Sequence, residues 1–229
     1  EAHLPAFNKS FKDLELGWFW DEETYIDLLK INGGKNRILH YSNYLNRNLS
    51  NSEVLNIHKR KQYHYLKLVE SGAVKLKAGV MRLIKELREK NVRQFIVTSS
   101  SRNQVKALMK VLFREFNPFE FFIASEDVYL HKPHPEPYLK AISLSGIKTS
   151  NSIVFEDSIP GAKSSLSAKL PTICVQSNIP VIFESEIDLQ IFINTLGDRN
   201  ESTKIIKGPE ISQGNVDYHF LNRFLSYNK

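Results

Sequence analysis

The amino-acid sequence predicts an α/β protein with a doubly wound parallel sheet and a small α-helical domain. From residue 1 to about residue 76, apolar side chains recur at helical spacing and strand patterns are nearly absent. From about residue 77 onward, four short apolar strands alternate with helices, which is typical of a parallel sheet covered by helices. We therefore expect two domains, a helical one over residues 1–76 and an α/β one over residues 77–229.

The helical domain is expected to contain four helices. Phe7 and Phe11 lie one helical turn apart, and the segment 21–31 has acidic residues in its first turn, where the helix dipole favours them. A third helix follows the glycine turn at 33–34, and a long fourth helix covers about 52–69. These segments predict a small helical bundle.

The α/β domain is expected to alternate helices that have one apolar face with short apolar strands. The predicted strands lie within the segments 93–101, 121–127, 152–157 and 171–176. The predicted helices lie within the segments 80–91, 104–112, 135–146 and 161–170. The polar tail at 198–213 is expected to be a loop, and a closing helix is expected at 216–225.

Composition excludes several classes of protein. The hydrophobic content of 41% and charged content of 24% are ordinary for a soluble globular chain, and no apolar run is long enough to span a bilayer. The first residues lack the pattern of a secretory signal, and the single cysteine, Cys174, has no partner for an internal disulfide. The net charge of +6 fits an anionic ligand, but Lys and Arg are spread along the chain. We therefore expect neither a nucleic-acid partner nor a membrane partner.

Polar side chains follow the predicted strands where each strand ends. Ser99 and Ser100 follow the first strand, Lys132 comes after the second, and Glu156 and Asp157 end the third. Ligands of open parallel sheets bind beyond the carboxyl ends of the strands, so these side chains are expected at one edge of the sheet.

These residue types together favour phosphate chemistry. Two carboxylates in one pocket repel each other, and Mg²⁺, which prefers oxygen ligands, would stabilise both in the charged form. A hydroxyl and an ammonium beside them suit a phosphoryl group. Each element alone has another interpretation: the serine run is also typical of a helix N-cap, and the acid pair before Pro-Gly is also typical of a capped turn.

Three motifs, "IVTSSSRN", "HKPHPEPY" and "IVFEDSIPG", occur in an order that resembles the haloacid dehalogenase-like hydrolase superfamily. The resemblance implies that Ser99 holds the transferring phosphoryl group and that Lys132 neutralises it. It further implies that Glu156 and Asp157 bind Mg²⁺. The helical domain would then be a cap inserted after the first core strand.

The segments "AFNKSF", "WFWDEETYIDLLKINGGKNRI" and "LKAGV" resemble the CbbY branch of that superfamily. The resemblance implies a monomeric phosphatase of small phosphorylated sugars, with xylulose-1,5-bisphosphate as the characteristic substrate, in the cytoplasm or in a plastid stroma. Lys35 and Arg37 on the cap would hold a second phosphate, and Ser100 and Asn103 would also bind substrate. For Lys35 and Arg37 the alternative is a pair of exposed basic residues at a helix start.

The Asp-x-Asp-Gly-Thr motif that defines the superfamily does not occur in the sequence. The resemblance implies that it carries the nucleophilic aspartate, which forms an aspartyl-phosphate, and that it lies just upstream of residue 1. The alternatives are a catalytically inactive truncated or regulatory protein that binds sugar phosphates, and a β-phosphoglucomutase-like mutase. A dehalogenase is disfavoured, because it needs no metal and the acid pair argues for one.

Overall fold

A computed structural model describes residues 2–176, 191–198, 202–207 and 214–227. The chain forms two compact units. The helical unit comprises residues 1–75 and 103–112, and the α/β unit comprises residues 76–102 and 113–229. The chain thus leaves the helical unit next to the predicted boundary, and it returns to it once for a single helix.

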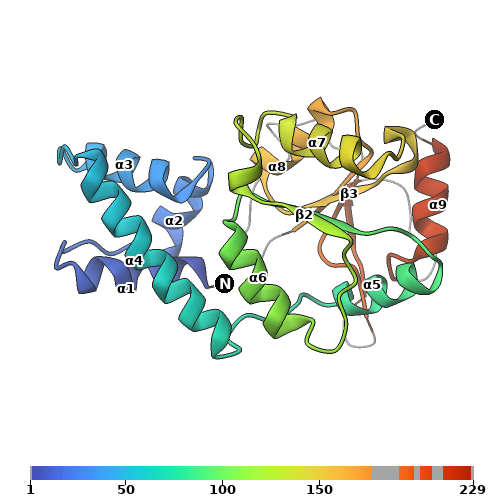
Figure 1. The fold of residues 1–229 in the computed structure, drawn as a ribbon, viewed down its shortest axis with the longest axis horizontal. Coiled ribbons are helices and arrows are strands. Elements are labelled where there is room, and N and C mark those ends of the chain that lie inside the picture. Colours follow the sequence, from blue (N-terminus) through green and yellow to red (C-terminus); the bar gives the residue numbers. More distant parts are fainter. Residues whose placement is uncertain (1, 177–190, 199–201, 208–213, 228–229) are drawn as a thin grey trace. The chain divides into compact units, whose positions relative to one another are not determined.

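The helical unit contains the four predicted helices. They are α1 (His3–Asp13), α2 (Glu22–Leu29), α3 (Gly34–Tyr44) and α4 (Asn51–Glu70). Helices α1 and α4 lie side by side (Figure 1). The core of the unit is aromatic: Trp20 is fully buried and its ring packs against Phe7, Phe11 and Tyr25.

Local sequence explains where these helices begin. The Asp21 side chain accepts a hydrogen bond from the Thr24 backbone N–H at 2.8 Å and so caps α2. Ser50 and Glu53 form a reciprocal capping box at the start of α4. Gly33, before α3, has a φ of 86°, a conformation that favours glycine.

Helix α6 (Arg102–Leu112) packs within the helical unit from its second residue onward. Its side chains Ala107, Leu108 and Val111 pack against a cluster that includes Tyr65 and Val69 of α4. The sequence pattern assigned this helix to the α/β domain, because strand and helix alternate there. Its apolar face instead joins the core of the helical unit.

The α/β unit contains each strand and helix predicted for it, apart from α6, and two further strands. In chain order its elements are α5 (Val80–Glu89), β1 (Phe95–Val97), β2 (Phe121–Ile123), η1 (Ser125–Asp127), α7 (Glu136–Ser145), η2 (Thr149–Asn151), β3 (Val154–Glu156), α8 (Ile159–Ser167), β4 (Thr172–Val175), β5 (Ile191–Ile193), β6 (Ile205–Lys207) and α9 (Tyr218–Tyr227). The predicted loop at 198–213 is wrong in part, because β6 lies within it. This strand is three residues long and lies between polar segments, so it gives little pattern in the sequence.

The strands form two sheets. Strand β1 pairs with β2 in parallel, and the second sheet has the order β3-β4-β5-β6, in which only β6 is antiparallel to its neighbour. Among the described residues β1 and β3 each pair on one side only. The residues of β1 are half-buried, whereas those of β4 and β5 are fully buried. The parallel strands and their helices confirm the predicted α/β class.

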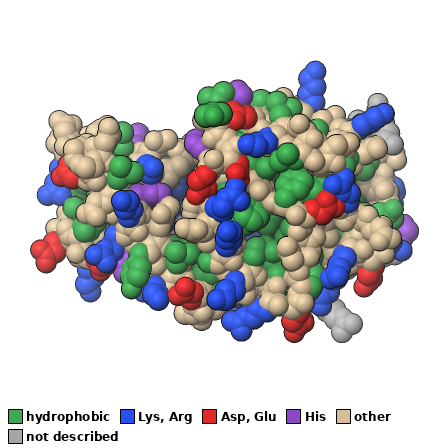
Figure 2. Space-filling model, viewed as in Figure 1, with side chains coloured by type: hydrophobic (Ala, Val, Ile, Leu, Met, Phe, Trp, Pro, Cys, Tyr) green, Lys and Arg blue, Asp and Glu red, His purple; other side chains and the backbone are tan. Residues whose placement is uncertain are grey.

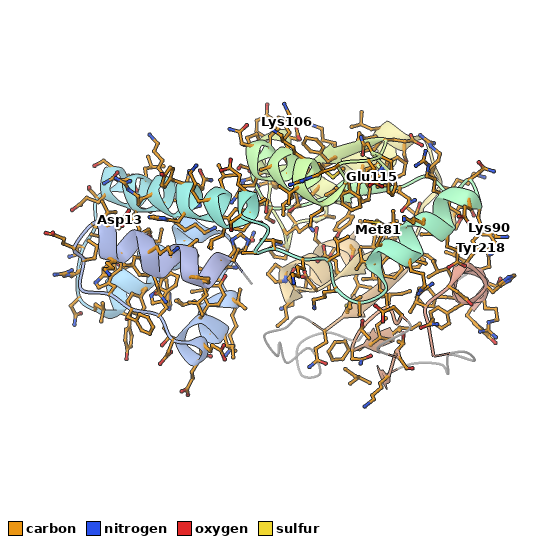
Figure 3. All side chains as sticks on the ribbon, turned by 90° about the horizontal axis from the view of Figure 1, so that it is seen from below. Asp13, Met81, Lys90, Lys106, Glu115 and Tyr218 are labelled. Carbon is orange, nitrogen blue, oxygen red and sulfur yellow. The ribbon has the colours of Figure 1, made fainter. Side chains whose placement is uncertain are left out.

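Helices α5 and α9 pack on the second sheet. Leu83 of α5 and Phe220 of α9 belong to one buried cluster with Ile173 and Ile191 of the sheet. Figure 3 shows the two helices meeting near their labelled residues, where the Lys90 Nζ lies 5.9 Å from the centroid of the Tyr218 ring.

The surface carries charges of both signs. Figure 2 shows Lys and Arg side chains distributed over the visible face of both units rather than gathered in one patch. Within the described part of the chain, no helix has the length and apolar character required to cross a membrane.

Candidate active site

The candidate site lies in the α/β unit, where β1 and β3 end. Ser99 and Ser100 follow β1, and Glu156 is the last residue of β3, with Asp157 directly after it. Lys132 comes from the segment between η1 and α7. The parallel direction of the strands brings their carboxyl ends to one edge, as predicted for this fold class.

Lys132 and Glu156 form a buried ion pair. The Lys132 Nζ donates to Glu156 Oε1, and the two residues are only 6% and 7% exposed. The Lys132 Nζ also donates to the backbone carbonyl of Val97, the last residue of β1, at 2.9 Å. One lysine side chain therefore joins the ends of two strands that do not pair with each other.

Tyr138 of α7 is a third member of this cluster, and the sequence analysis did not assign it a role. Its hydroxyl accepts from Lys132 Nζ at 3.2 Å and donates to Glu156 Oε1. The side chain is 5% exposed, and burial, together with the charge of Glu156, raises the pKa of this phenol well above its usual value. A tyrosine in the first turn of a helix, directly after Pro137, has an ordinary packing explanation, so the sequence gives no signal of this role.

The turn after β3 holds the Glu156 carboxylate against the start of α8. Ser158 caps α8 by accepting from the Gly161 backbone N–H at 3.1 Å, and its hydroxyl donates to Glu156 Oε2 at 3.2 Å. A Cβ at Gly161 would meet both oxygens of Glu156 at under 3.0 Å. Glycine is therefore required at this position if the carboxylate is to keep its place.

Asp157 has a different environment from its neighbour. Asp157 is exposed, whereas Glu156 is buried. After burial, the charges of both acids contribute to the raised pKa of Tyr138, so both lie near this phenol. That they share one pocket stays a prediction. The ammonium of Lys132 is a counter-charge for Glu156. Repulsion between the two acids therefore does not by itself require a metal ion.

The oxygen donors at this edge nevertheless fit Mg²⁺. This ion is commonly held by one or two protein carboxylates together with waters and substrate phosphates. Asp157 and Glu156 supply such carboxylates at adjacent positions. No group of three or more His, Cys, Asp or Glu side chains suited to a metal ion occurs among the described residues, so further ligands would be water, substrate or another segment.

The serine segment after β1 is held by the η1 turn. Ser99 is exposed, and Ser100 is half-buried, with its carbonyl accepting from the Ser125 backbone N–H at 3.0 Å. The first N–H of α6, that of Arg102, donates to the Glu126 carboxylate at 3.0 Å and 3.2 Å. An internal carboxylate thus takes a position at which an incoming anion would bind. The roles of Ser99 and Ser100 remain predictions.

Lys35, Arg37 and Asn103 belong to the helical unit. Lys35 and Asn103 are exposed. The Arg37 Nε donates to the backbone carbonyls of Leu28 at 3.0 Å and Ile31 at 2.9 Å, which ties α3 to the end of α2. The roles of these three residues in binding substrate are also predictions.

The helical unit also contains a cluster of basic side chains that the sequence analysis missed. Lys61 of α4 is 5% exposed, and its Nζ lies 2.9 Å from His3 Nδ1 of α1. Burial, followed by the charge of Arg37, lowers the pKa of Lys61 to about 7. Burial and the charges of Lys61 and Lys35 lower the pKa of His58 to about 4. The cluster therefore favours an anion, which would stabilise the protonated forms.

Comparisons with known proteins agree with this architecture. The sequence matches the family described as haloacid dehalogenase-like hydrolase over residues 1–175. It is 33% identical over 179 residues to protein CbbY of Rhodobacter capsulatus, an alignment that covers 77% of this chain and 79% of the relative.

Solved structures extend the comparison. A variant of CbbY from Rhodobacter sphaeroides in complex with xylulose-(1,5)bisphosphate matches with a TM-score of 0.76 and 27% identity, over 85% of this chain and 87% of that one. A β-phosphoglucomutase from Clostridium difficile matches with a TM-score of 0.74 over 99% of this chain and 90% of that one, and its 16% identity indicates a shared fold alone.

Proposed function

Because the chain belongs to the haloacid dehalogenase-like hydrolase family and is a hydrolase, we propose that it is a Mg²⁺-dependent phosphatase of a small phosphorylated sugar. The observation that supports this most is the buried pair of Lys132 and Glu156 at the carboxyl ends of β1 and β3. A desolvated ammonium stabilises the negative charge of a phosphoryl group more than an exposed one does, because water screens it less.

In this proposal Lys132 neutralises the phosphoryl oxygens and Ser99 donates a hydrogen bond to them. Glu156 and Asp157 would hold the Mg²⁺, which when bound polarises the phosphoryl group and balances its charge. Glu156 also orients Lys132, since its Oε1 accepts from the ammonium.

The reaction requires a carboxylate nucleophile, and we propose an aspartate on a strand that would pair with the open sides of β1 and β3. The attack forms an aspartyl-phosphate and breaks the ester P–O bond, and the departing sugar oxygen takes a proton from a second aspartate, the general acid of the same Asp-x-Asp motif. Water then hydrolyses the acyl phosphate, which releases inorganic phosphate and regenerates the carboxylate. Within the part of the chain that the structure describes, β1 and β3 each pair on one side only, which supports this arrangement.

The basic cluster of the helical unit supports a substrate with a second phosphate. Lys35 and Arg37 are the proposed ligands, and the Lys61 amine adds a further basic group. Burial, followed by the charges of Lys61 and Arg37, lowers the pKa of His3 well below its usual value, which indicates a positive environment. The CbbY variant in complex with xylulose-(1,5)bisphosphate leads us to propose that bisphosphate as substrate.

The experiment is a phosphate-release assay on the natural protein, with xylulose-1,5-bisphosphate and a sugar monophosphate compared with and without Mg²⁺. We expect metal-dependent release, with KM for the bisphosphate raised in Lys35→Ala and Arg37→Ala but unchanged in the control Lys59→Ala, an exposed lysine of α4. Release that is equal in all these variants would contradict the second-phosphate site. Binding of the bisphosphate without release would support an inactive binding protein instead.

A further inference from the structure

The inference concerns Tyr138 and rests on the proposed function. The Lys132 ammonium carries three N–H donors, and its Nζ lies within hydrogen-bonding reach of the Val97 carbonyl, the Tyr138 hydroxyl and Glu156 Oε1. The ammonium also lies 4.8 Å from the centroid of the Tyr138 ring. The tyrosine thus contacts the lysine through both its hydroxyl and its ring.

The Tyr138 hydroxyl closes a triangle of hydrogen bonds. It accepts from Lys132 and donates to the same carboxylate oxygen, Glu156 Oε1, to which Lys132 donates. The other oxygen, Oε2, accepts from Ser158. All the members of the triangle are buried, so a change in any one leaves a polar group of the others unsatisfied.

We propose that Tyr138 is a positioning residue that fixes the Lys132 ammonium and the Glu156 carboxylate in the arrangement used for phosphoryl transfer and for binding Mg²⁺. A phenylalanine at this position keeps the ring and the volume but removes the hydroxyl. Glu156 then loses one of the two donors to Oε1, and Lys132 loses one of its acceptors. Both side chains gain freedom to rotate away from the substrate and metal.

The test compares Tyr138→Phe with the natural protein in two measurements. In phosphate release at saturating Mg²⁺, we expect kcat to fall about tenfold and KM to change by less than about twofold. The lost hydrogen bond positions the charged Lys132 and Glu156 side chains for the reaction, whereas it makes no contact with the substrate. In calorimetry with Mg²⁺ alone, we expect Kd to rise about threefold or more, because a Glu156 side chain that is free to rotate loses more conformational entropy when it binds the ion. Tyr129→Phe is the matched control, because Tyr129 is 95% exposed, and it should change neither quantity.

A double-mutant cycle with Glu156→Gln separates positioning from packing. If Tyr138 affects Mg²⁺ by holding the Glu156 carboxylate, adding Tyr138→Phe to Glu156→Gln changes the Kd for Mg²⁺ by less than about twofold, because the carboxylate that it holds is already absent. An equal fold-change in both backgrounds would overturn the inference, and so would tighter Mg²⁺ binding by Tyr138→Phe. If the natural protein releases phosphate and binds Mg²⁺, and Tyr138→Phe behaves identically, the inference alone is overturned. If the natural protein neither releases phosphate nor binds Mg²⁺, the proposed function and this inference are overturned together.

Discussion

Replacing Gly161 with alanine tests whether the Glu156 carboxylate must lie against the first turn of α8. A Cβ at this position would meet the carboxylate at under 3.0 Å, so either the side chain or the helix must move. The helix is fixed by its Ser158 cap and by the buried residues Ile159 and Ala162. We therefore expect the carboxylate to move away from its partners.

The magnitude follows from the contacts that are lost. Leaving one member of a buried ion pair without its partner costs about 3–5 kcal/mol. Alanine is favoured over glycine within a helix by about 1 kcal/mol, which offsets part of that loss. The net destabilisation is about 2–4 kcal/mol, which corresponds to a fall in Tm of about 5–15 °C for a chain of this size.

The assay is thermal unfolding followed by circular dichroism, with Ser167→Ala as the matched control. Ser167 is an exposed residue of the same helix, and its replacement should change the unfolding free energy by no more than about 0.5 kcal/mol. A Tm for Gly161→Ala within about 2 °C of the natural protein would refute the reasoning, because the carboxylate would then have room that the structure denies it.

Four further predictions concern three other groups. Asp157→Asn should raise the Kd for Mg²⁺ at least about tenfold without lowering Tm, because Asp157 is exposed, and an unchanged Kd in calorimetry would exclude it as a ligand. Affinity for the bisphosphate, measured as 1/KM, should fall as the pH rises above about 7, because Lys61 then loses its proton. In Lys61→Gln this dependence on pH should disappear. The pKa of Lys61 is about 7 in the folded protein and 10.5 in the unfolded chain, so the unfolded chain binds more protons between these two pH values. The contribution of Lys61 to the unfolding free energy should therefore rise with pH over that range. Denaturant titrations in which this free energy falls with pH, relative to Lys61→Gln, would contradict this. The thiol of Cys174, with its pKa raised to about 12 by burial, should not react with iodoacetamide at neutral pH until the protein unfolds, and rapid labelling of the folded protein would contradict its burial.

The sequence was sufficient to predict which strand ends carry polar side chains. Ligands of parallel sheets bind at the carboxyl ends of the strands, so Lys132 and Glu156 were predicted to lie close together although they are far apart in the sequence. In the structure the two side chains are in contact. Sequence alone could not predict that Glu156 is buried and Asp157 exposed, because adjacent residues on a strand end point in different directions. That difference is set by the packing of α8 against the carboxylate.

Clusters assembled from several helices were the hardest to predict. His3 and Lys61 meet only because α1 and α4 pack in one particular register, which the periodicity of either helix alone does not fix. Tyr138 has the same difficulty, because its apolar ring accounts for its place in α7 without reference to its hydroxyl. Strand β6 was missed for a different reason, since pairing with β5 rather than its own sequence makes it a strand.

The most direct test of the proposed function is the rate of phosphate release from xylulose-1,5-bisphosphate by the natural protein, measured with Mg²⁺ beside the variant Asp157→Ala. The account predicts release that requires Mg²⁺ and that falls to the background of the uncatalysed reaction in the variant. Equal release by the two proteins, or no release by the natural protein above that background, would contradict it.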